Sequence, residues 1–548
     1  MRTGGQALVD QLELHGVDAV FCVPGESYLP VLDALRDSPI RLFSCRHEAA
    51  AANMAEAYGK LTGRPGICFV TRGPGATHAS IGVHIADQDS TPLILFVGQV
   101  ARKNLGRAAF QELDYPAVFG SMTKWAAQVD EADRIPEHVA RAFAAATRGR
   151  PGPVVLALPE DVLAEETDAQ DASPIESPRP APTDDDLVHV AERIARAERP
   201  LVIVGEGGWT AQAGADVLAF CEASRIPVVA SFRCQDYVEN HSGVYAGHLT
   251  LGLDPALARR VQEADLIVAV GGRLGDIPTS GYTLLGVPRP RQTLIHAHPD
   301  PDELGRVYEV DVPIVSDLTE FAAALRRILP VESPPWIEWT KAARADYLAN
   351  LERCPMPGDV NLGDVMAFLR GRLPADAIVT CGAGNFTVWA HRFYEFSQYG
   401  TQLAPRAGAM GYGVPAALAA KALHPDRLVI CIAGDGDFMM ASSELATAVQ
   451  YDLPVIVLVV DNGMFGTIRM HQERLYPGRV SGTDLVNPDF AVFAESFGCH
   501  GETVEHTDEL EAAFERSVAS GRPAVVRLVV DAEGISPRTT ITELREGS

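Results

Sequence analysis

The chain has little positive charge, no CxxC cysteine pair and no long apolar run. It carries 46 Lys and Arg against 72 Asp and Glu, a formal net charge of −26, which disfavours a nucleic-acid partner because phosphate binding relies on basic side chains. Nine cysteines stand singly within apolar stretches, as is typical of buried thiols in a reducing cytoplasm. No segment has the roughly 18 consecutive apolar residues of a membrane span, and the amino-terminal stretch predicts an amphipathic helix instead of a signal peptide. We therefore expect a cytoplasmic protein that has no membrane association.

Length and composition predict several globular domains. A chain of 548 residues is too long for one ordinary core. Its content of 47% hydrophobic and 22% charged residues is that of a globular protein. Two segments rich in Pro, Ser and Asp, 166–186 and 331–360, indicate linkers. They delimit an N-terminal domain at 1–165, a central domain at 187–330 and a C-terminal domain with a tail at 361–548. Apolar runs of strand length alternate with helical stretches throughout, which predicts three α/β domains with doubly wound parallel sheets.

The first and third domains also resemble each other. The run from Ala57 to Val100 can be laid on the run from Ala417 to Asn462, helix on helix and strand on strand. The pattern predicts a duplicated module.

The segment from Gly434 to Asn462 carries the strongest chemical signal. It reads as a strand, a helix and a second strand, with "GDG" after the first strand and "DN" after the second. Because parallel strands end at the same edge of a sheet, we expect Asp435 and Asn462 to lie there together. An all-oxygen donor set suits Mg²⁺ better than Zn²⁺, and the flanking glycines Gly434 and Gly436 would let a diphosphate approach closely. "GDG" alone could be a surface turn, but the spacing and the βαβ context favour a metal site.

This segment resembles the magnesium and diphosphate motif of thiamine diphosphate enzymes, in which GDG is followed by a pair of asparagines. Asp461 replaces the first asparagine, and Asn462 keeps the second. The resemblance implies that the metal ligands are Asp435, Asn462 and the backbone carbonyl of Met464, with thiamine diphosphate and Mg²⁺ as cofactors. It also implies cofactor contacts from the surrounding residues Gly434, Gly436, Asp437, Phe465, Gly466 and Thr467.

A second segment, "RLFSCRHEAAAANMAEAYGK", resembles the part of that family that supplies the catalytic acid. Glu48 stands where a strand meets a helix. The resemblance implies that its carboxyl group hydrogen-bonds a ring nitrogen of the cofactor's aminopyrimidine. On local sequence alone, Glu48 would read as an acid at a helix N-terminus, favoured by the helix dipole.

Further blocks resemble the acetolactate synthase-like branch of the family. "VFCVPGESYLPVLDAL" resembles its first strand and turn, which places Pro24 and Gly25 beside the cofactor. "AFQELDYPAVFGSMTKW" resembles the block whose counterparts of Gln111 and Lys124 face the active site, so both are expected to take part in catalysis. Taken alone, each would be an ordinary polar surface residue.

Two blocks in the third domain extend this resemblance. "LAPRAGAMGYGVPAAL" resembles the stretch that wedges the cofactor into a bent conformation, with Met410 as the wedge and the Gly408 carbonyl as an acceptor. A methionine here would otherwise be a core filler. "CGAGNFTVWAHRF" resembles a diphosphate-side block, although Asn385 and Phe386 replace the usual Gln and His. The resemblance implies cofactor contacts from Ala383, Gly384 and Asn385.

Departures from the family pattern concern the substrate and a flavin. His471 stands where the anabolic synthases carry a tryptophan, and we expect a substrate pocket formed by Glu26, His78, Gln111 and His471. In the central domain, where the synthases bind FAD, Arg273 is kept but His298 and Pro299 replace an acidic segment. FAD binding is therefore possible but is not predicted.

The resemblance implies a homodimer or homotetramer with each active site between the first domain of one subunit and the third domain of another. The expected reaction is decarboxylation of a 2-oxo acid such as pyruvate, followed by ligation to a second carbonyl. The alternatives are a decarboxylase or C–C lyase for another substrate, a flavin-dependent oxidase, and a non-catalytic cofactor-binding protein. The intact set of Glu48, Asp435 and Asn462 argues against the last alternative.

Overall fold

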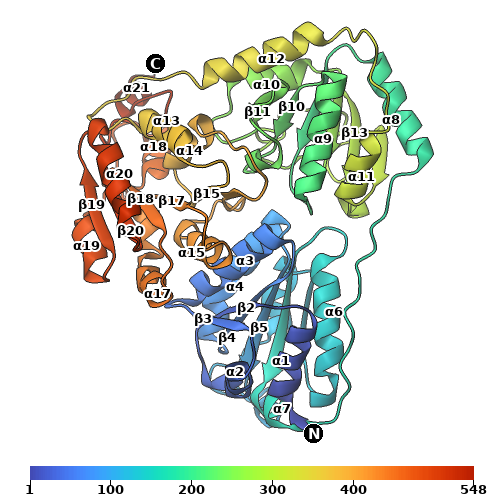
Figure 1. Ribbon diagram of the computed structural model, residues 1–548, viewed down its shortest axis with the longest axis vertical. Helices are drawn as coiled ribbons and strands as arrows, with labels where there is room; N and C mark the ends of the chain where they lie inside the picture. Colours follow the sequence, from blue (N-terminus) through green and yellow to red (C-terminus); the bar gives the residue numbers. More distant parts are fainter. Residues whose placement is uncertain (548) are drawn as a thin grey trace.

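The computed structural model describes residues 1–547 and contains three six-stranded parallel sheets. In Figure 1 the N-terminal domain, in blue, lies below, while the central domain, in green, and the C-terminal domain, in orange and red, lie side by side above it. Helices cover both faces of the sheets, because strands such as β4 (Gly66–Val70) and β18 (Ile456–Asp461) are buried along their whole length. The predicted α/β class is confirmed.

The first domain has a sheet in the order β3-β2-β4-β5-β7-β6, and a short antiparallel pair, β1 with β8, joins its two ends. Its strands are β1 (Arg2–Thr3), β2 (Ala19–Cys22), β3 (Arg41–Ser44), β4, β5 (Leu93–Gln99), β6 (Trp125–Gln128), β7 (Pro153–Pro159) and β8 (Glu166–Thr167). Its helices are α1 (Gly4–Leu14), α2 (Leu29–Arg36), α3 (Glu48–Thr62), α4 (Pro74–Asp89), α5 (Tyr115–Phe119), α6 (Ile135–Thr147) and α7 (Glu160–Ala164), with 3₁₀ turns η1 (Glu26–Tyr28), η2 (Arg102–Asn104), η3 (Gly120–Met122) and η4 (Ala132–Arg134).

The third domain has the order β16-β15-β17-β18-β20-β19. Its strands are β15 (Ile378–Cys381), β16 (Gln402–Leu403), β17 (Val429–Gly434), β18, β19 (His500–Val504) and β20 (Ala524–Val529). Its helices are α13 (Leu362–Arg372), α14 (Phe386–Phe393), α15 (Gly413–Leu423), α16 (Asp435–Met439), α17 (Leu445–Gln450), α18 (Gly466–Leu475), α19 (Phe490–Ser496), α20 (Leu510–Ala519) and α21 (Ile541–Glu546), with η7 (Ser442–Glu444) and η8 (Thr507–Glu509). When only the strands of each six-stranded sheet are numbered, the first and third sheets share the order 2-1-3-4-6-5, as the duplication predicts.

The central sheet differs. Its order, β11-β10-β9-β12-β13-β14, is that of a classical dinucleotide-binding fold, 3-2-1-4-5-6. The strands are β9 (Pro200–Val204), β10 (Val228–Ala230), β11 (Tyr245–His248), β12 (Leu266–Val270), β13 (Thr293–His298) and β14 (Val312–Val315). The helices are α8 (Asp184–Arg196), α9 (Ala211–Ser224), α10 (Pro255–Glu263), α11 (Leu318–Leu325) and α12 (Ile337–Asn350), with η5 (Gln235–Tyr237) and η6 (Pro301–Glu303).

The segment 331–360, which the sequence marks as a linker, contributes to the central core. Its helix α12 buries Trp339 and Tyr347 among the central strands, and Trp336 just before it is fully buried. The domain limits drawn from the sequence remain predictions, and α12 packs with the domain that precedes it.

Eight of the nine cysteines are buried and the ninth, Cys354, is half-buried, as their apolar sequence context predicts. No helix in residues 1–547 combines the length and apolar character that a membrane crossing requires.

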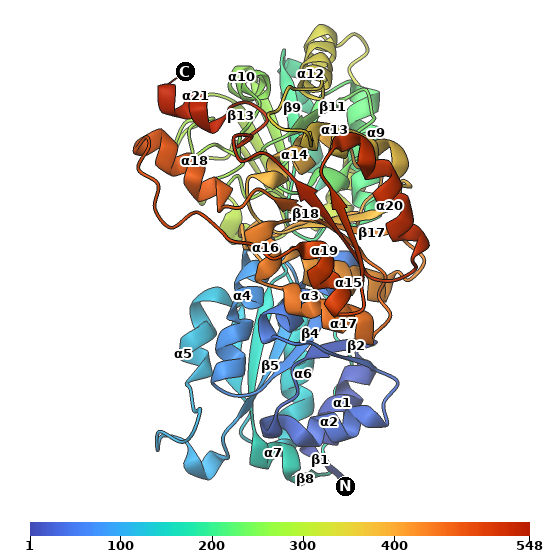
Figure 2. The ribbon, with the colours of Figure 1, turned by 90° about the vertical axis from the view of Figure 1, so that its left-hand side faces the viewer.

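The first and third domains meet through α3 and α15, which lie side by side in Figures 1 and 2. The Tyr412 hydroxyl donates to the Glu56 carboxylate at 2.5 Å across this contact. Glu444, from η7, accepts the backbone N–H groups of Arg46 at 3.1 Å and His47 at 3.0 Å. The loop that leads into α3 is therefore held by the third domain.

Candidate active site

The third sheet brings the predicted metal ligands to one edge. Strands β17 and β18 are adjacent and parallel, with Gly434 paired to Val460. The Asp435 carboxylate accepts the Gly463 N–H at 2.9 Å, and Asn462 Oδ1 accepts the Met464 N–H at 3.2 Å. Asp435 thus lies against the turn that contains the other two predicted ligands.

This edge carries an excess of negative charge. Asp435 is 3% exposed, and burial raises its pKa, with a smaller upward contribution from the Asp461 charge and opposing hydrogen bonds from the Gly436 N–H and the Asn487 amide. The Asn487 Nδ2 group bridges Asp435 and Asp461 at 2.8 Å each, and Arg527 pairs with Asp461 at 2.7 Å. A buried carboxylate among amide and carbonyl oxygens fits Mg²⁺.

The glycines around Asp435 admit aromatic rings. A Cβ at Gly434 would lie 2.9 Å from the Phe386 ring, and one at Gly436 would lie 2.5 Å from the Phe465 ring. A side chain at either position would overlap these rings, which explains both glycines by close packing. Close approach of a diphosphate to this turn stays a prediction.

Asp437 joins the segments predicted to hold the cofactor. Its carboxylate accepts the Gly411 N–H at 2.7 Å and the Ala383 N–H at 3.4 Å. Burial raises its pKa to about 7. The predicted wedge, Met410, is half-buried beside Gly411, and Gly408 takes a left-handed conformation with φ of 66°, which glycine allows. Asp437 therefore fixes β15 and the 408–411 turn to each other.

Asn385 ties the same edge to α18 and to the C-terminal tail. Its Oδ1 accepts the Thr467 hydroxyl at 2.9 Å, and its Nδ2 donates to the Ile535 carbonyl at 2.9 Å. His471, five residues into α18, is exposed. The tail thus lies against the predicted cofactor edge.

In the first domain, Glu48 is the first residue of α3. Its Oε2 lies 2.9 Å from His78 Nδ1 on α4. The Gln111 backbone covers Gly73, so that a Cβ at Gly73 would lie 2.8 Å from the Gln111 carbonyl oxygen. Gln111 Oε1 is buried and has no hydrogen-bond partner in residues 1–547. Glu48, His78 and Gln111 therefore surround one turn at the carboxyl edge of the first sheet.

Pro24, Gly25 and Glu26 follow β2 at the same edge. A Cβ at Gly25 would lie 2.5 Å from the Thr71 side chain, which explains the glycine by close packing. Glu26 pairs with Arg72 at 3.2 Å and is otherwise open to solvent.

Glu48 stays within its own domain. In the part of the chain that the structure describes, its side chain hydrogen-bonds only to His78, whereas the contacts of Asp435 lie within the third domain. Figure 2 shows α16, which begins at Asp435, in the upper half of the molecule and the first sheet below it. Within one chain the hydrogen bonds of the predicted acid and those of the predicted metal edge therefore stay in different domains.

Comparison with known proteins identifies the family of the chain. Residues 2–118, 187–325 and 382–528 match the N-terminal, central and C-terminal domain models of thiamine pyrophosphate enzymes. The chain is 36% identical to the acetolactate synthase large subunit of Corynebacterium glutamicum, over 96% of this chain and 87% of the relative. It is 32% identical to the acetolactate synthase isozyme 2 large subunit of Escherichia coli, over 96% of this chain and 95% of the relative. The chain belongs to the thiamine pyrophosphate enzyme family. It is an acetolactate synthase-like member of that family.

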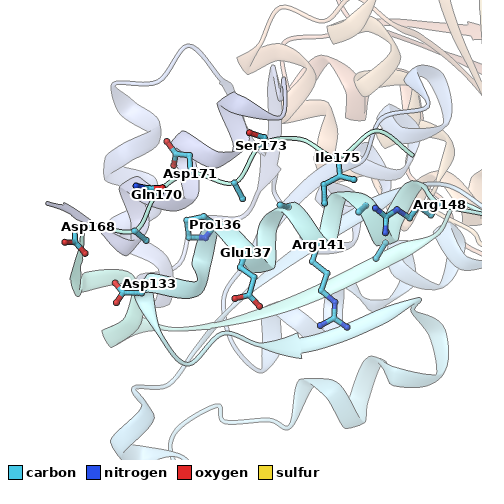
Figure 3. Close-up of a pocket in the computed structure, with 15 residues that line it drawn as sticks. Asp133, Pro136, Glu137, Arg141, Arg148, Asp168, Gln170, Asp171, Ser173 and Ile175 are labelled. Carbon is cyan, nitrogen blue, oxygen red and sulfur yellow. The ribbon is translucent and has the colours of Figure 1, made fainter. Parts of the chain in front are cut away.

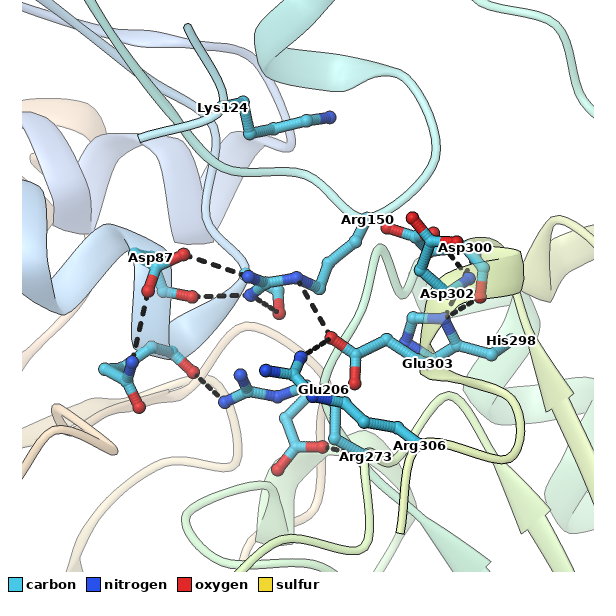
Figure 4. Close-up of polar contacts among 12 residues, drawn as sticks. Asp87, Lys124, Arg150, Glu206, Arg273, His298, Asp300, Asp302, Glu303 and Arg306 are labelled. Carbon is cyan, nitrogen blue, oxygen red and sulfur yellow. Dashed lines mark hydrogen bonds and ion pairs between the residues drawn. The ribbon is translucent and has the colours of Figure 1, made fainter. Parts of the chain in front are cut away.

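In this thiamine pyrophosphate enzyme Lys124 stands apart from Glu48. It precedes β6, at the amino edge of the first sheet, and its Nζ contacts the Arg148 carbonyl. Desolvation lowers its pKa to about 8, although Asp300 opposes the shift. Figure 4 shows it near Arg150, which pairs with Asp87 at 2.9 Å. One chain therefore does not bring Lys124 to the Glu48 cluster, and its catalytic role remains a prediction.

The central sheet of the enzyme has an acid at the point where a dinucleotide fold binds phosphate. Glu206 follows β9, is 4% exposed, and accepts the Arg273 N–H at 2.6 Å. Burial lowers the pKa of His298 to about 4, so the imidazole is neutral. Figure 4 shows the Glu206 and Arg273 pair beside His298. A buried carboxylate at this switch point would repel the negatively charged diphosphate of a flavin. These residues therefore do not fit FAD.

A large cavity of the enzyme lies elsewhere. It measures about 750 Å³ and lies between α6 and the linker near Asp168, Asp171 and Ile175. In Figure 3 the linker with Asp171, Ser173 and Ile175 runs along α6, which carries Glu137 and Arg141. None of the predicted cofactor ligands lines it.

Sequence reasoning missed Asn487 and Glu444. Asn487 stands in an irregular loop 25 positions beyond Asn462, and no motif marks it. In the sequence Glu444 reads as a helix-terminal acid, and its interdomain role depends on the docking of α3 against the third domain.

Proposed function

We propose that the enzyme decarboxylates a 2-oxo acid such as pyruvate and ligates the remaining fragment to a second carbonyl, with thiamine diphosphate and Mg²⁺ as cofactors. The observation that carries the proposal is the oxygen-donor edge formed by Asp435, Asn462 and Met464 at the ends of two adjacent strands. The similarity to acetolactate synthase large subunits over nearly the full length supports the reaction class.

Each part of the site has a chemical task in this proposal. Asp435, Asn462 and the Met464 carbonyl hold Mg²⁺, which neutralises a diphosphate. When bound, thiamine diphosphate supplies the carbon nucleophile and the electron sink for loss of carbon dioxide. Glu48 holds a proton toward the aminopyrimidine. Met410 supplies an apolar surface that excludes water, which favours departure of the substrate carboxylate.

We further propose a homodimer or a tetramer built from such dimers. Within one chain Glu48 contacts first-domain groups, and the Asp435 edge lies in the third domain. A second copy of the chain would bring the two halves together. Cross-linking and sedimentation would measure this assembly.

We propose that the reaction needs no flavin. Glu206 supports this statement because its buried carboxylate stands at the switch point of the central sheet. The expected result is a colourless purified enzyme whose activity does not depend on added FAD. A flavin absorption spectrum at full occupancy would favour the oxidase alternative instead.

The product decides between ligation and simple decarboxylation. Purified protein is incubated with thiamine diphosphate, Mg²⁺ and a panel of 2-oxo acids, and products are identified by mass spectrometry. A ligated 2-hydroxy-3-oxo acid supports the proposal, and Glu48→Gln serves as the inactive control. Carbon dioxide with only an aldehyde would select the decarboxylase. The exposed His471, at a position where the anabolic synthases carry a tryptophan, favours testing several acceptors.

A further inference from the structure

The Glu48 carboxylate has one defined side-chain partner. His78, in the second turn of α4, places Nδ1 2.9 Å from Glu48 Oε2. The Glu48 side chain is 14% exposed and the His78 side chain is 52% exposed. His78 is therefore the solvent-facing neighbour of a mostly buried acid.

His47 completes the cluster by stacking. Its ring lies on the His78 ring with centroids 4.6 Å apart and planes inclined by 28°. Its Nδ1 accepts the Ala49 N–H at 3.1 Å, so its position is fixed by the start of α3. The stack limits how far the His78 ring can turn away from Glu48.

The cluster suits hydrogen bonding better than metal binding. His47, Glu48 and His78 offer ligand atoms within 4.8 Å of one another. However, lone pairs of imidazole lie in the ring plane, and two stacked rings direct them along nearly parallel planes. His47 Nδ1 is also engaged by the backbone. The three groups do not converge on one ion.

One carboxylate oxygen remains for another partner. Oε2 is taken by His78, whereas Oε1 lies beside Gly75, where a Cβ would stand 3.5 Å away. A Cβ at this position would make an ordinary van der Waals contact with Oε1. The two oxygens of Glu48 therefore have different surroundings.

We propose that His78 is a positioning and proton-exchange residue for Glu48, an inference that rests on the proposed function. His78 holds Oε2 so that Oε1 faces the aminopyrimidine nitrogen of the cofactor, and it connects the carboxyl group to solvent. A proton from a solvent hydronium ion would enter at His78 Nε2, the Nδ1 proton would pass to Oε2, and the proton carried by Oε1 would pass to the aminopyrimidine nitrogen. The imidazole ends neutral and the carboxyl group ends protonated, and the reverse transfer restores the starting state.

The other ionisable groups near Glu48 do not titrate in the neutral range. Burial raises the pKa of Tyr28 on η1 and of Cys68 on β4, and the nearby Glu48 charge raises both further. His47 is the remaining imidazole. A pH profile of proton exchange at Glu48 therefore tests the cluster of His47, Glu48 and His78.

The test measures exchange of the thiazolium C2 proton for deuterium in the enzyme loaded with thiamine diphosphate and Mg²⁺, without a 2-oxo acid, by acid quench and NMR. His78→Asn keeps a side-chain amide that can donate to Glu48 but cannot relay a proton. We expect exchange at least about 10-fold slower, a flattened pH profile, and partial rescue by added imidazole. Cofactor affinity, measured by fluorescence on the apoprotein, should stay unchanged. His84→Asn, an exposed histidine of the same helix, is the matched control.

The outcomes separate this inference from the proposed function. If Glu48→Gln exchanges at the wild-type rate, Glu48 is not the acid and the proposed function fails. If Glu48→Gln is slow and His78→Asn exchanges like the wild type, the proposed function stands and the role of His78 is overturned. A His78→Asn enzyme that loses cofactor affinity or thermal stability, without rescue by imidazole, would also overturn it, because His78 would then be structural.

Discussion

The first and third domains share one strand order but place different chemistry at the carboxyl edge of the sheet. In the first domain the second strand, β3, is followed by Glu48, and the third strand, β4, is followed by the Gly73 turn. In the third domain the second strand, β16, is followed by Met410, and the third strand, β17, is followed by Asp435. One scaffold thus carries the predicted catalytic acid in one copy and the predicted metal edge in the other.

The difference teaches where each function is encoded. The strands and helices of the two domains set only the positions at the sheet edge, and the loops after the second and third strands supply the reactive groups. Neither domain alone holds a complete site. The following predictions test this division of roles.

Glu48→Gln should have the largest effect. It keeps the shape of the side chain but removes the proton-carrying carboxyl group, so turnover should fall by about 100-fold to 10,000-fold, with cofactor binding retained. Steady-state kinetics on the purified enzyme measure the loss. Glu137→Gln, on the exposed face of α6, is the control. Unchanged turnover in Glu48→Gln would show that Glu48 is not the catalytic acid.

Asp435→Asn should act on binding instead. We expect the Mg²⁺-dependent affinity for thiamine diphosphate to fall by roughly 100-fold or more, because losing a group that merely supports a metal ligand costs about 10- to 100-fold. Without Mg²⁺ the variant should melt at a higher temperature than the wild type, since burial raises the pKa of Asp435 and disfavours its charge.

Calorimetric titration and thermal melts measure both effects, and Asp426→Asn, an exposed acid of the third domain, is the control. If Asp435→Asn keeps the Mg²⁺ dependence of the wild type, the third domain holds the cation by other ligands.

Glu444→Gln tests the junction between the two copies. The Glu444 carboxylate accepts N–H groups from Arg46 and His47, directly before Glu48, and the Thr447 hydroxyl. The variant keeps one oxygen and introduces an N–H group that faces other donors, so we expect a loss of about 1–3 kcal/mol in the free energy of unfolding. Denaturant melts measure it.

Gln450→Ala is the matched control for this junction, because Gln450 contacts the exposed Arg46 side chain at 2.7 Å. If both variants have wild-type stability, the third domain does not hold the Glu48 loop.

Much of this arrangement is predictable from the sequence. Continuous apolar runs mark the strands, and the parallel connection of β17 to β18 places Asp435 beside Asn462, as the motif spacing predicts. The similarity between the two domains extends to their shared strand order.

Other features depend on contacts between distant segments. The Phe386 and Phe465 rings fill the space beside the glycines, and Asn487 reaches Asp435 from an irregular loop. Glu206 reads as one residue of a glycine-rich turn until the strand order of the central sheet places it at the switch point. Local patterns do not encode such contacts, because they arise from tertiary packing.

The C-terminal tail, which ends in α21, extends the third domain beyond the part that matches the first. We expect a substitution in this tail to have the smallest effect. Glu473 on α18 is buried and pairs with Arg545 on α21 at 2.7 Å and with Arg469 at 2.8 Å. The Arg545 hydrogen bonds hold the pKa of Glu473 at about 2, below the ordinary 4.5. The ion pairs therefore stabilise the docked tail fully above pH 4.5, and this stabilisation is lost as the pH falls toward 2.

Arg545→Gln removes the largest cause of that shift, so α21 should detach at a higher pH than in the wild type. Hydrogen exchange of residues 535–546 at several pH values measures the detachment, and Arg538→Gln, whose contacts reach Asp254 and Asn350 instead, is the comparison variant. Because the Ile535 carbonyl accepts from Asn385, a loosened tail should also release the cofactor slightly faster. Equal exchange in Arg545→Gln and the wild type would mean that the apolar contacts of Ile535 and Ile541 with Met464 dock the tail without the ion pairs.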